Sequence, residues 1–544
     1  MPEISDVHSD LVLAGGTVLT GDPSRPLTDA VAVADGRVVA LGDEARQREA
    51  QAAHTVDLAG RTLLPGFRDG HVHPLHAGEE LLGPSITGAG SVDELLDRLQ
   101  AWAAAHPDLP AVAGGGYDPT LAPDGLFDAA ALDRVVPDRP VLLASTDHHA
   151  LWVNSAAFAA AGIDATTPDP AGGVLVRRPD GSLLGTVLES AIDLFDPLLP
   201  DLGPGHRADG LRLGLAELAR VGIVWAQDAV AGLDDVPVWL AAAERGELTC
   251  RVDLALRASP EHWRDQLEPF VEARAEVAER GKGLLTARNV KLFADGVIEG
   301  GTGAVLDPYV DSGGFGILNW PQAELEAATA AFDAAGFQLH VHAIGDAGVR
   351  AALDAIERLA AVNGPRDRRP VLAHLQLVHP DDRPRFAALG VVANFEPLWA
   401  QLDPVMVELT IPRLGPDRAA AQYPIASLLH SGARLSFGSD WPVTSLDPLH
   451  GIEVAVTRRT PAGHPQGGWT PHERLSLAAA LAAYTSGTAW QAFEEEEAGV
   501  IAVGRRADLC LLGADLAGGP SEVNGLAGVP VEGTWLAGTE VFRC

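Results

Sequence analysis

Eight short apolar segments recur along the middle of the chain, and helix-like stretches such as PQAELEAATAAFDAAG stand between them. This alternation predicts parallel strands joined by helices, and eight such strands are typical of a (β/α)8 barrel. The predicted strands cover residues 63–73, 222–229, 250–256, 289–295, 337–344, 369–376, 390–397 and 434–440. We therefore expect an α/β protein built around a TIM-like barrel.

The two ends of the chain differ from this pattern. Short runs rich in Val, Leu and Thr alternate there with Gly-Gly, Asp-Gly and Gly-Asp turn signals, which predicts a small antiparallel sheet. We expect residues 1–63 and 499–544 to form one composite β-sandwich, with the barrel domain occupying residues 64–498. The first and second barrel strands are too far apart for a single crossover. Residues about 83–204, dense in Pro, Gly and Asp, are therefore predicted to form an inserted subdomain.

The composition of the chain excludes several classes of partner. Hydrophobic residues make up 47% of the 544 residues, enough for a large core, and the net charge of −35 is spread along the whole chain. Such a surface repels nucleic acid and anionic membranes, so we expect neither as a partner. The three cysteines, Cys250, Cys510 and Cys544, are far apart, which argues against a disulfide framework. With no basic, apolar leader and no long apolar run, a cytoplasmic protein is expected.

Polar residues stand near the C-terminal ends of five predicted strands, at the rim where barrel enzymes carry their catalytic residues. The first strand ends in His71 and His73, and residues two apart on a strand point to the same face. Alone, this pair also fits two ordinary polar residues at a strand end. Four further residues are predicted to converge on the same rim: Lys291, His342, His374 and Asp440.

These residue types suggest a metal site. Neutral imidazole and carboxylate groups suit zinc and similar divalent ions, and a catalytic ion keeps one coordination position open for water. Lys291 is one of only two lysines in the chain, beside Lys282. Burial makes a lysine lose its proton readily, and the free amine can add carbon dioxide to become a carbamate that bridges two metals. An ordinary salt-bridged lysine is the alternative.

The segments PGFRDGHVH, VKLFADG, HVHAIGD, AHLQ and FGSDWPV, in this order, resemble the amidohydrolase superfamily. The resemblance is to its amidohydrolase-3 branch, which includes N-substituted formamide deformylase-like metal-dependent hydrolases, and it covers nearly the full length. It implies hydrolysis of a non-peptide C–N bond, of the amide or formamide type, by a metal-activated hydroxide. It also implies two Zn2+ ions per chain, with Mn2+ or Fe2+ as alternatives, and a small amide-like substrate. Members of the superfamily often form dimers, so a homodimer is one open assembly.

The same resemblance implies roles for individual residues. His71 and His73 would bind the more buried metal, and N-carboxylated Lys291 would bridge the two ions. His342 and His374 would bind the second ion. Asp440 would be both a metal ligand and the proton shuttle.

The resemblance also extends to residues outside the barrel strands. The motif DHHALWVNS implies that His149 reaches the substrate or its oxyanion, although bracing of the insert is an equal alternative. Glu189 and Trp399 are possible pocket walls, His340 is expected to be a packed core residue, and Asp69 is expected to support the first-strand turn. The chain departs from the branch in reading EPLW after the seventh predicted strand, where QP followed by a histidine is common.

Two other functions remain open at this point. One is a deaminase-like hydrolase that uses a single metal and an unmodified Lys291. The other is a non-catalytic scaffold on the same fold, which is disfavoured because all six expected ligand positions are filled. Formamides, N-acyl amines, cyclic amides and carbamates are all open as substrates.

Overall fold

The computed structural model describes residues 9–200, 202–516 and 525–544. Eight parallel strands form a nearly closed barrel sheet in the order β18-β17-β16-β15-β14-β13-β12-β6. These strands are β6 (Phe67–Val72), β12 (Ile223–Ala231), β13 (Arg251–Arg257), β14 (Leu285–Phe293), β15 (Gln338–Ala343), β16 (Val371–His374), β17 (Val392–Phe395) and β18 (Arg434–Phe437). Each lies within or overlaps one predicted strand, so the expected α/β barrel is confirmed.

The barrel closes between β6 and β18, the two ends of its sheet. Two hydrogen bonds join the segments that leave these strands: the amide of Asp440 donates to the carbonyl of His71 at 2.7 Å, and the amide of His73 donates to the carbonyl of Trp441 at 3.0 Å. A Cβ atom at Gly438 would lie 2.7 Å from the nitrogen of His71. Only glycine therefore permits this approach, and closure brings the end of β18 against the first histidine.

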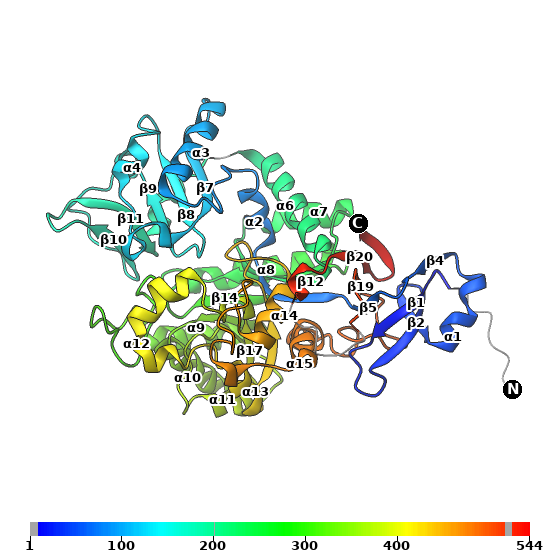
Figure 1. Cartoon of the computed structure of the whole chain (residues 1–544). Coiled ribbons are helices and arrows are strands. Elements are labelled where there is room, and N and C mark those ends of the chain that lie inside the picture. The colour runs from blue at the N-terminus through cyan, green and yellow to red at the C-terminus, as the bar shows by residue number, and fades with distance from the viewer. Residues whose placement is uncertain (1–8, 201, 517–524) are drawn as a thin grey trace.

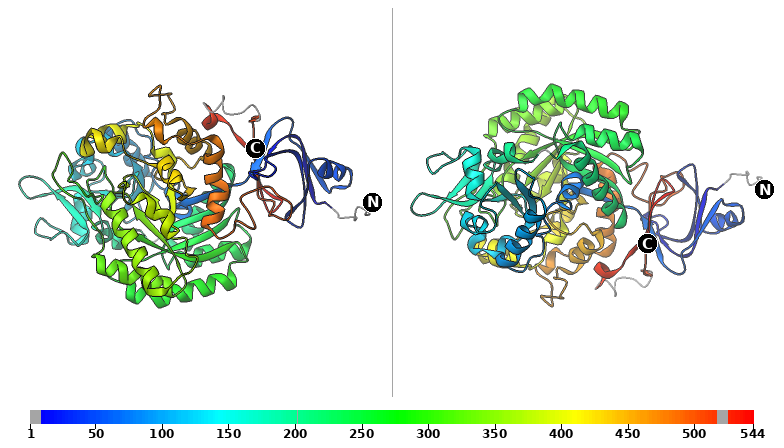
Figure 2. Two further views of the ribbon diagram at one scale, coloured as in Figure 1. Left: turned by 90° about the horizontal axis from the view of Figure 1, so that it is seen from below. Right: turned by 90° about the horizontal axis from the view of Figure 1, so that it is seen from above.

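Helices line the outside of the barrel (Figure 2). They are α6 (Gly203–Arg220), α7 (Val236–Arg245), α8 (Trp263–Arg280), α9 (Gln322–Ala334), α10 (Asp346–Asn363), α11 (Arg383–Leu389), α12 (Ile411–Ala419), α13 (Ile425–His430), α14 (Pro448–Thr457), α15 (Leu477–Ala482) and α16 (Thr488–Gln491). Helix α10 shows why they pack there, because Val349, Leu353 and Ile356 recur at helical spacing and are all buried. No helix in the described part of the chain is long and apolar enough to cross a bilayer.

Strands from the two ends of the chain join in one sheet beside the barrel (Figure 1). The sheet contains β1 (Leu11–Leu19), β2 (Leu27–Ala34), β3 (Arg37–Leu41), β4 (His54–Asp57), β5 (Thr62–Pro65), β19 (Leu509–Leu512), β20 (Val531–Leu536) and β21 (Thr539–Arg543). Strand β19 pairs antiparallel with β5, and Leu13, Leu63, Leu511 and Trp535 share one core. Helix α1 (Asp43–Gln47) packs beside this sheet. Residues 1–8 and 517–524 of the two predicted terminal segments lie outside the described residues.

A third sheet lies within the range expected for the insert, of which residue 201 is not described. Its strands, in the order β10-β11-β9-β8-β7, are β7 (Val112–Tyr117), β8 (Val141–Ser145), β9 (Ala150–Val153), β10 (Gly173–Arg177) and β11 (Leu183–Glu189). Helix α2 (Pro74–Glu80) leads out of the barrel, and α3 (Val92–Ala105), α4 (Ala129–Asp133) and α5 (Ser155–Ala161) accompany the sheet. The insert and the terminal sheet lie on different sides of the barrel (Figures 1 and 2).

Glu494 forms ion pairs with Arg68 of β6 and with Arg506, in the segment that leads from the barrel to β19. Its carboxylate lies 2.8 Å from Arg68, which is 1% exposed, and 3.0 Å from Arg506. Burial on its own would raise the pKa of Glu494, but the two guanidinium groups hold this pKa at about 2. The folded pKa is thus lower than the ordinary value of 4.5, so the stabilisation is present above pH 4.5 and is lost as the pH falls toward 2.

We expect Glu494→Gln to destabilise the protein by about 3 kcal/mol at pH 7, because Arg68 would stay buried without its counter-charge. The deficit in thermal midpoint should be smaller at pH 3, where the wild-type carboxylate has lost most of its advantage. Thermal unfolding at both pH values measures this. Glu496→Gln is the control, since Glu496 is 87% exposed in its pair with Arg505. Equal deficits at both pH values would contradict the assignment.

Candidate metal centre

The structure brings together the six residues predicted at the barrel rim. The ring of His71 lies 5.4 Å from that of His73 and 4.6 Å from that of His374, and the rings of His342 and His374 are 4.5 Å apart. Lys291 and Asp440 both face His71. All six side chains therefore meet at the C-terminal ends of β6, β14, β15, β16 and β18.

Asp440 places one oxygen between the first two histidines. Its Oδ1 is 2.7 Å from Nε2 of His73 and 3.5 Å from Nε2 of His71. Burial on its own would raise the pKa of this carboxyl, but the hydrogen bond and charge of His73, together with His374 and Lys291, lower it below the ordinary value. The carboxylate is thus ionised, with an oxygen directed at two imidazole nitrogens.

Lys291 is 1% exposed, and its Nζ lies 3.2 Å from Nε2 of His71 and 4.7 Å from the ring centre of Phe293. Burial lowers the pKa of this amine to about 8, with a further lowering by Arg257, while Asp440 opposes the shift. About a tenth of the amine is therefore uncharged at pH 7, far more than for an exposed lysine.

His71 directs the lone pair of its Nε2 toward Lys291. An ammonium group on Lys291 can only donate, so Nε2 of His71 accepts and Nδ1 carries the hydrogen. This Nδ1 contacts Nε2 of His340 at 2.9 Å. Burial, reinforced by nearby positive groups, lowers the pKa of both rings well below the ordinary value, so both are neutral. His340 is buried as expected, but its contact with His71 was not predicted, although the HVH spacing places it on the same strand face as His342.

His342 is fixed by the loop that follows β14. Its Nε2 donates to the carbonyl of Gly296 at 3.1 Å, which leaves the lone pair on Nδ1. Burial also lowers the pKa of His342 well below its ordinary value. Like His71, this ring is a neutral imidazole, the form that binds a metal ion.

Glu396 is a site residue that the sequence reasoning missed. It follows β17 and is fully buried, and its Oε2 accepts a hydrogen bond from Nδ1 of His374 at 2.8 Å. Its Oε1 lies 3.9 Å from Nδ1 of His71 and has no hydrogen-bond partner among the residues that the structure describes. Its position near the C-terminal end of the seventh predicted strand was the available signal. Trp399, three residues later, stacks on the His374 ring. The two ring centroids are 5.3 Å apart and the angle between the ring planes is 6°, so the indole lies against one side of the cluster.

His149 reaches the rim from the insert. Its Nδ1 bonds to Oε2 of Glu189 at 2.8 Å, and its ring centre is 5.0 Å from that of His342. Glu189 also accepts a hydrogen bond from the hydroxyl of Thr302, in the loop after β14. Burial opposes the charge on His149, but Glu189 raises the pKa of this imidazole to about 9. Adjacent His148 turns elsewhere, to Glu80 of α2 at 3.1 Å.

Asp69 spans the closing seam of the barrel. Its Oδ1 accepts from the amides of His71 and Ser439, both at 3.1 Å, and it is fully buried. Burial raises the pKa of this carboxyl to about 7. These bonds agree with a structural role, because they fix the backbone on both sides of the seam.

The side chains at the rim fit a divalent ion. Two sets of three side chains each offer potential ligand atoms that lie within 4.8 Å of one another inside the set. One set is His71, His374 and Glu396, and the other is His71, His73 and Asp440. The donors are imidazoles and carboxylates, the types that zinc and related ions bind. Oε1 of Glu396 is a further buried oxygen at the rim, and it accepts no hydrogen bond from any described residue.

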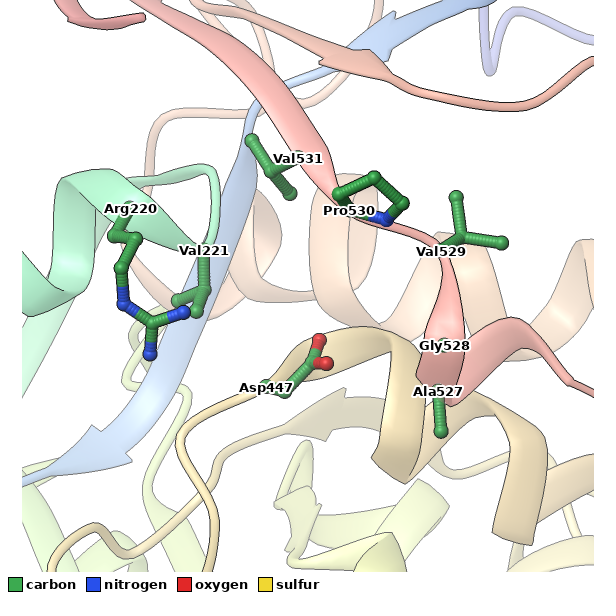
Figure 3. Close-up of a pocket in the computed structure, with 8 residues that line it drawn as sticks. All are labelled: Arg220, Val221, Asp447, Ala527, Gly528, Val529, Pro530 and Val531. Atoms are coloured by element: carbon green, nitrogen blue, oxygen red, sulfur yellow. The ribbon is translucent and has the colours of Figure 1, made fainter. Parts of the chain in front are cut away.

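A separate cavity of about 190 Å³ lies between the end of α6, the start of α14 and the segment leading into β20 (Figure 3). Arg220, Val221, Asp447 and residues 527–531 line it. None of these residues belongs to the histidine cluster, so this cavity is distinct from the candidate metal centre.

Comparisons with known proteins agree with the fold. The model of the Amidohydrolase family matches residues 54–542. A putative amidohydrolase, YtcJ, from Bacillus subtilis is 31% identical over 92% of this chain and 94% of its own length. An N-substituted formamide deformylase from Arthrobacter pascens is 26% identical over 93% of this chain and 94% of its own length. An uncharacterised metal-dependent hydrolase from Pyrococcus horikoshii shares the fold, with a TM-score of 0.72, 22% identity and coverage of 92% and 97%.

We expect added Zn2+ to raise the thermal midpoint of chelator-treated protein, because an ion that binds only the folded state stabilises it. At 100 times the dissociation constant the gain is about 2.7 kcal/mol. Differential scanning fluorimetry with and without Zn2+ measures the rise. His71→Ala should remove most of it, whereas His54→Ala, on the exposed face of β4, should not. An equal rise in both variants would place the ion elsewhere.

Proposed function

The chain belongs to the amidohydrolase family, and we propose that it is a hydrolase that cleaves a non-peptide C–N bond of the amide or formamide type in a small molecule. The observation that carries this proposal is the meeting of Asp440, several imidazoles and a buried amine at one barrel rim. Similarity to a formamide deformylase over 93% of the chain supports the class of bond.

In this proposal, the rim would hold two divalent ions. His71, His73 and Asp440 would hold one, His342 and His374 would hold the other, and N-carboxylated Lys291 would be shared by both. The lowered pKa of Lys291 supports the carbamate, because only the free amine adds carbon dioxide. Zn2+ is proposed, and Mn2+ or Fe2+ would suit the same ligands. When bound, such ions supply an activated water at neutral pH and polarise the substrate carbonyl.

The chain's own residues then move the protons. Asp440 accepts the proton of the attacking water as the oxygen adds to the carbonyl carbon. It returns this proton to the departing nitrogen as the C–N bond breaks, and the products are a carboxylic acid and an amine. His149, held by Glu189, donates a hydrogen bond to the carbonyl oxygen as negative charge develops there.

Metal content tests the carbamate bridge. We expect about two ions per chain in the parent, fewer in Lys291→Ala, and recovery when that variant is supplied with a short carboxylate such as propionate. Elemental analysis of protein purified without chelator gives the count. Lys282→Ala, which alters the only other lysine, at an exposed turn, is the matched control. One ion in both parent and Lys291→Ala would contradict the bridge and favour the deaminase-like alternative.

His149→Gln tests the substrate contact. We expect kcat for N-substituted formamides or N-acyl amines to fall on the order of 100- to 1,000-fold, because one donor to the developing charge is lost. Metal content should stay at the parent level. His148→Gln provides a matched control, since this neighbouring histidine faces Glu80. Equal losses in the two variants would argue that the turn merely braces the insert.

A further inference from the structure

Glu396 lies behind the imidazole rings of the metal centre. Its two oxygens face Nδ1 of His374, at 2.8 Å, and Nδ1 of His71, at 3.9 Å. By contrast, Lys291 and Asp440 face Nε2 of His71, at 3.2 and 3.5 Å. The carboxylate of Glu396 is therefore on the Nδ1 side of both rings, while the groups proposed to hold the ions are on the Nε2 side of His71.

This placement sets the tautomer that the neutral ring of His374 adopts. A carboxylate only accepts, so the hydrogen bond puts the ring hydrogen on Nδ1 and leaves the lone pair on Nε2. The stacked indole of Trp399 covers one face of the same ring. Two contacts thus restrict both the tautomer and the orientation of His374 before any ion is bound.

We propose that Glu396 is a positioning residue of the metal centre, acting through His374: it holds the Nδ1–H tautomer and strengthens Nε2 as a ligand with its negative charge. A carboxylate hydrogen-bonded to a ligating imidazole raises the basicity of that ligand. Oε1 lies 3.9 Å from Nδ1 of His71, too far for a hydrogen bond, so His374 is the proposed ligand through which this charge acts. This inference rests on the proposed metal centre, but it does not depend on the substrate.

The charge on Glu396 is otherwise costly. The side chain is fully buried, and burial raises the pKa of its carboxyl, as does the nearby charge of Asp440. His374 and Lys291 lower this pKa and partly offset the effect. A glutamine could accept the same hydrogen bond from His374 without carrying a charge. The variant Glu396→Gln therefore separates the charge from the geometry.

Competition between the protein and a chromophoric chelator for Zn2+ tests the proposal. We expect Glu396→Gln to weaken Zn2+ binding about 10- to 100-fold, as is usual for a partner of a ligating histidine. The thermal midpoint of the metal-free variant should stay near that of the parent. The matched control is Glu473→Gln, because Glu473 is also buried but bonds to Ser427 at the start of α13. This control should lose thermal stability and keep its Zn2+ affinity.

A double-mutant cycle with His374→Ala identifies the route of the effect. If Glu396 acts through His374, Glu396→Gln should cost little further affinity once that imidazole is absent. Additive losses would overturn the proposal, as would a Glu396→Gln affinity within about threefold of the parent. The visible spectrum of the Co2+ form should keep its ligand count in Glu396→Gln. Loss of an oxygen ligand would make Glu396 a direct ligand and overturn the positioning role.

The failure of this inference and the failure of the proposed function are distinguishable. A parent protein that binds no divalent ion would overturn both. If the parent binds Zn2+ and Glu396→Gln binds it equally tightly, only the proposed role of Glu396 would be overturned. Since every measurement here is of metal binding or stability, the choice of amide substrate has no influence on the result.

Discussion

The closing seam between β6 and β18 is the constraint on which the rest of the site depends. The amides of Asp440 and His73 donate across it, and Asp69 accepts from the backbone on both sides. The bonds that complete the barrel are therefore the bonds that set His71 and His73 against Asp440. A fold that failed to close would lose not only packing but also the meeting of carboxylate and imidazoles, so stability and site geometry share one cause.

Burial decides the ionic form of the groups that meet at this rim. It lowers the pKa of His71, His340 and His342, so these three rings are neutral, and it brings the pKa of Lys291 to about 8. Within the described part of the chain, Oε1 of Glu396 and Nδ1 of His340 are buried without hydrogen-bond partners. Unpaired buried polar atoms cost stability, and a cation placed among these groups would offset part of that cost for the carboxylate.

The sequence predicted the features that depend on local patterns. Eight apolar segments and the strand-end positions of His71, His73 and His374 can be recognised from a few consecutive residues each, and the barrel they predict is confirmed. The contacts of Glu396 and His340 could not be found in this way. Each depends on how far one strand is rotated and shifted against its neighbours, which no single segment encodes. The long-range packing that joins Glu189 to Thr302 was missed for the same reason.

The proposed metal ligands and the proposed substrate contact belong to different structural units. The strands of the barrel carry the former, whereas His149 belongs to the insert, which has its own sheet and its own apolar clusters. The insert is tied to the barrel rim by Glu189 with Thr302, and by His148 with Glu80. Because these ties lie outside the barrel sheet, changes in the insert can alter what faces the carbonyl of a substrate without altering the seam. If the proposed function holds, the shape of the insert, rather than the ligand set, would therefore determine selectivity among amides.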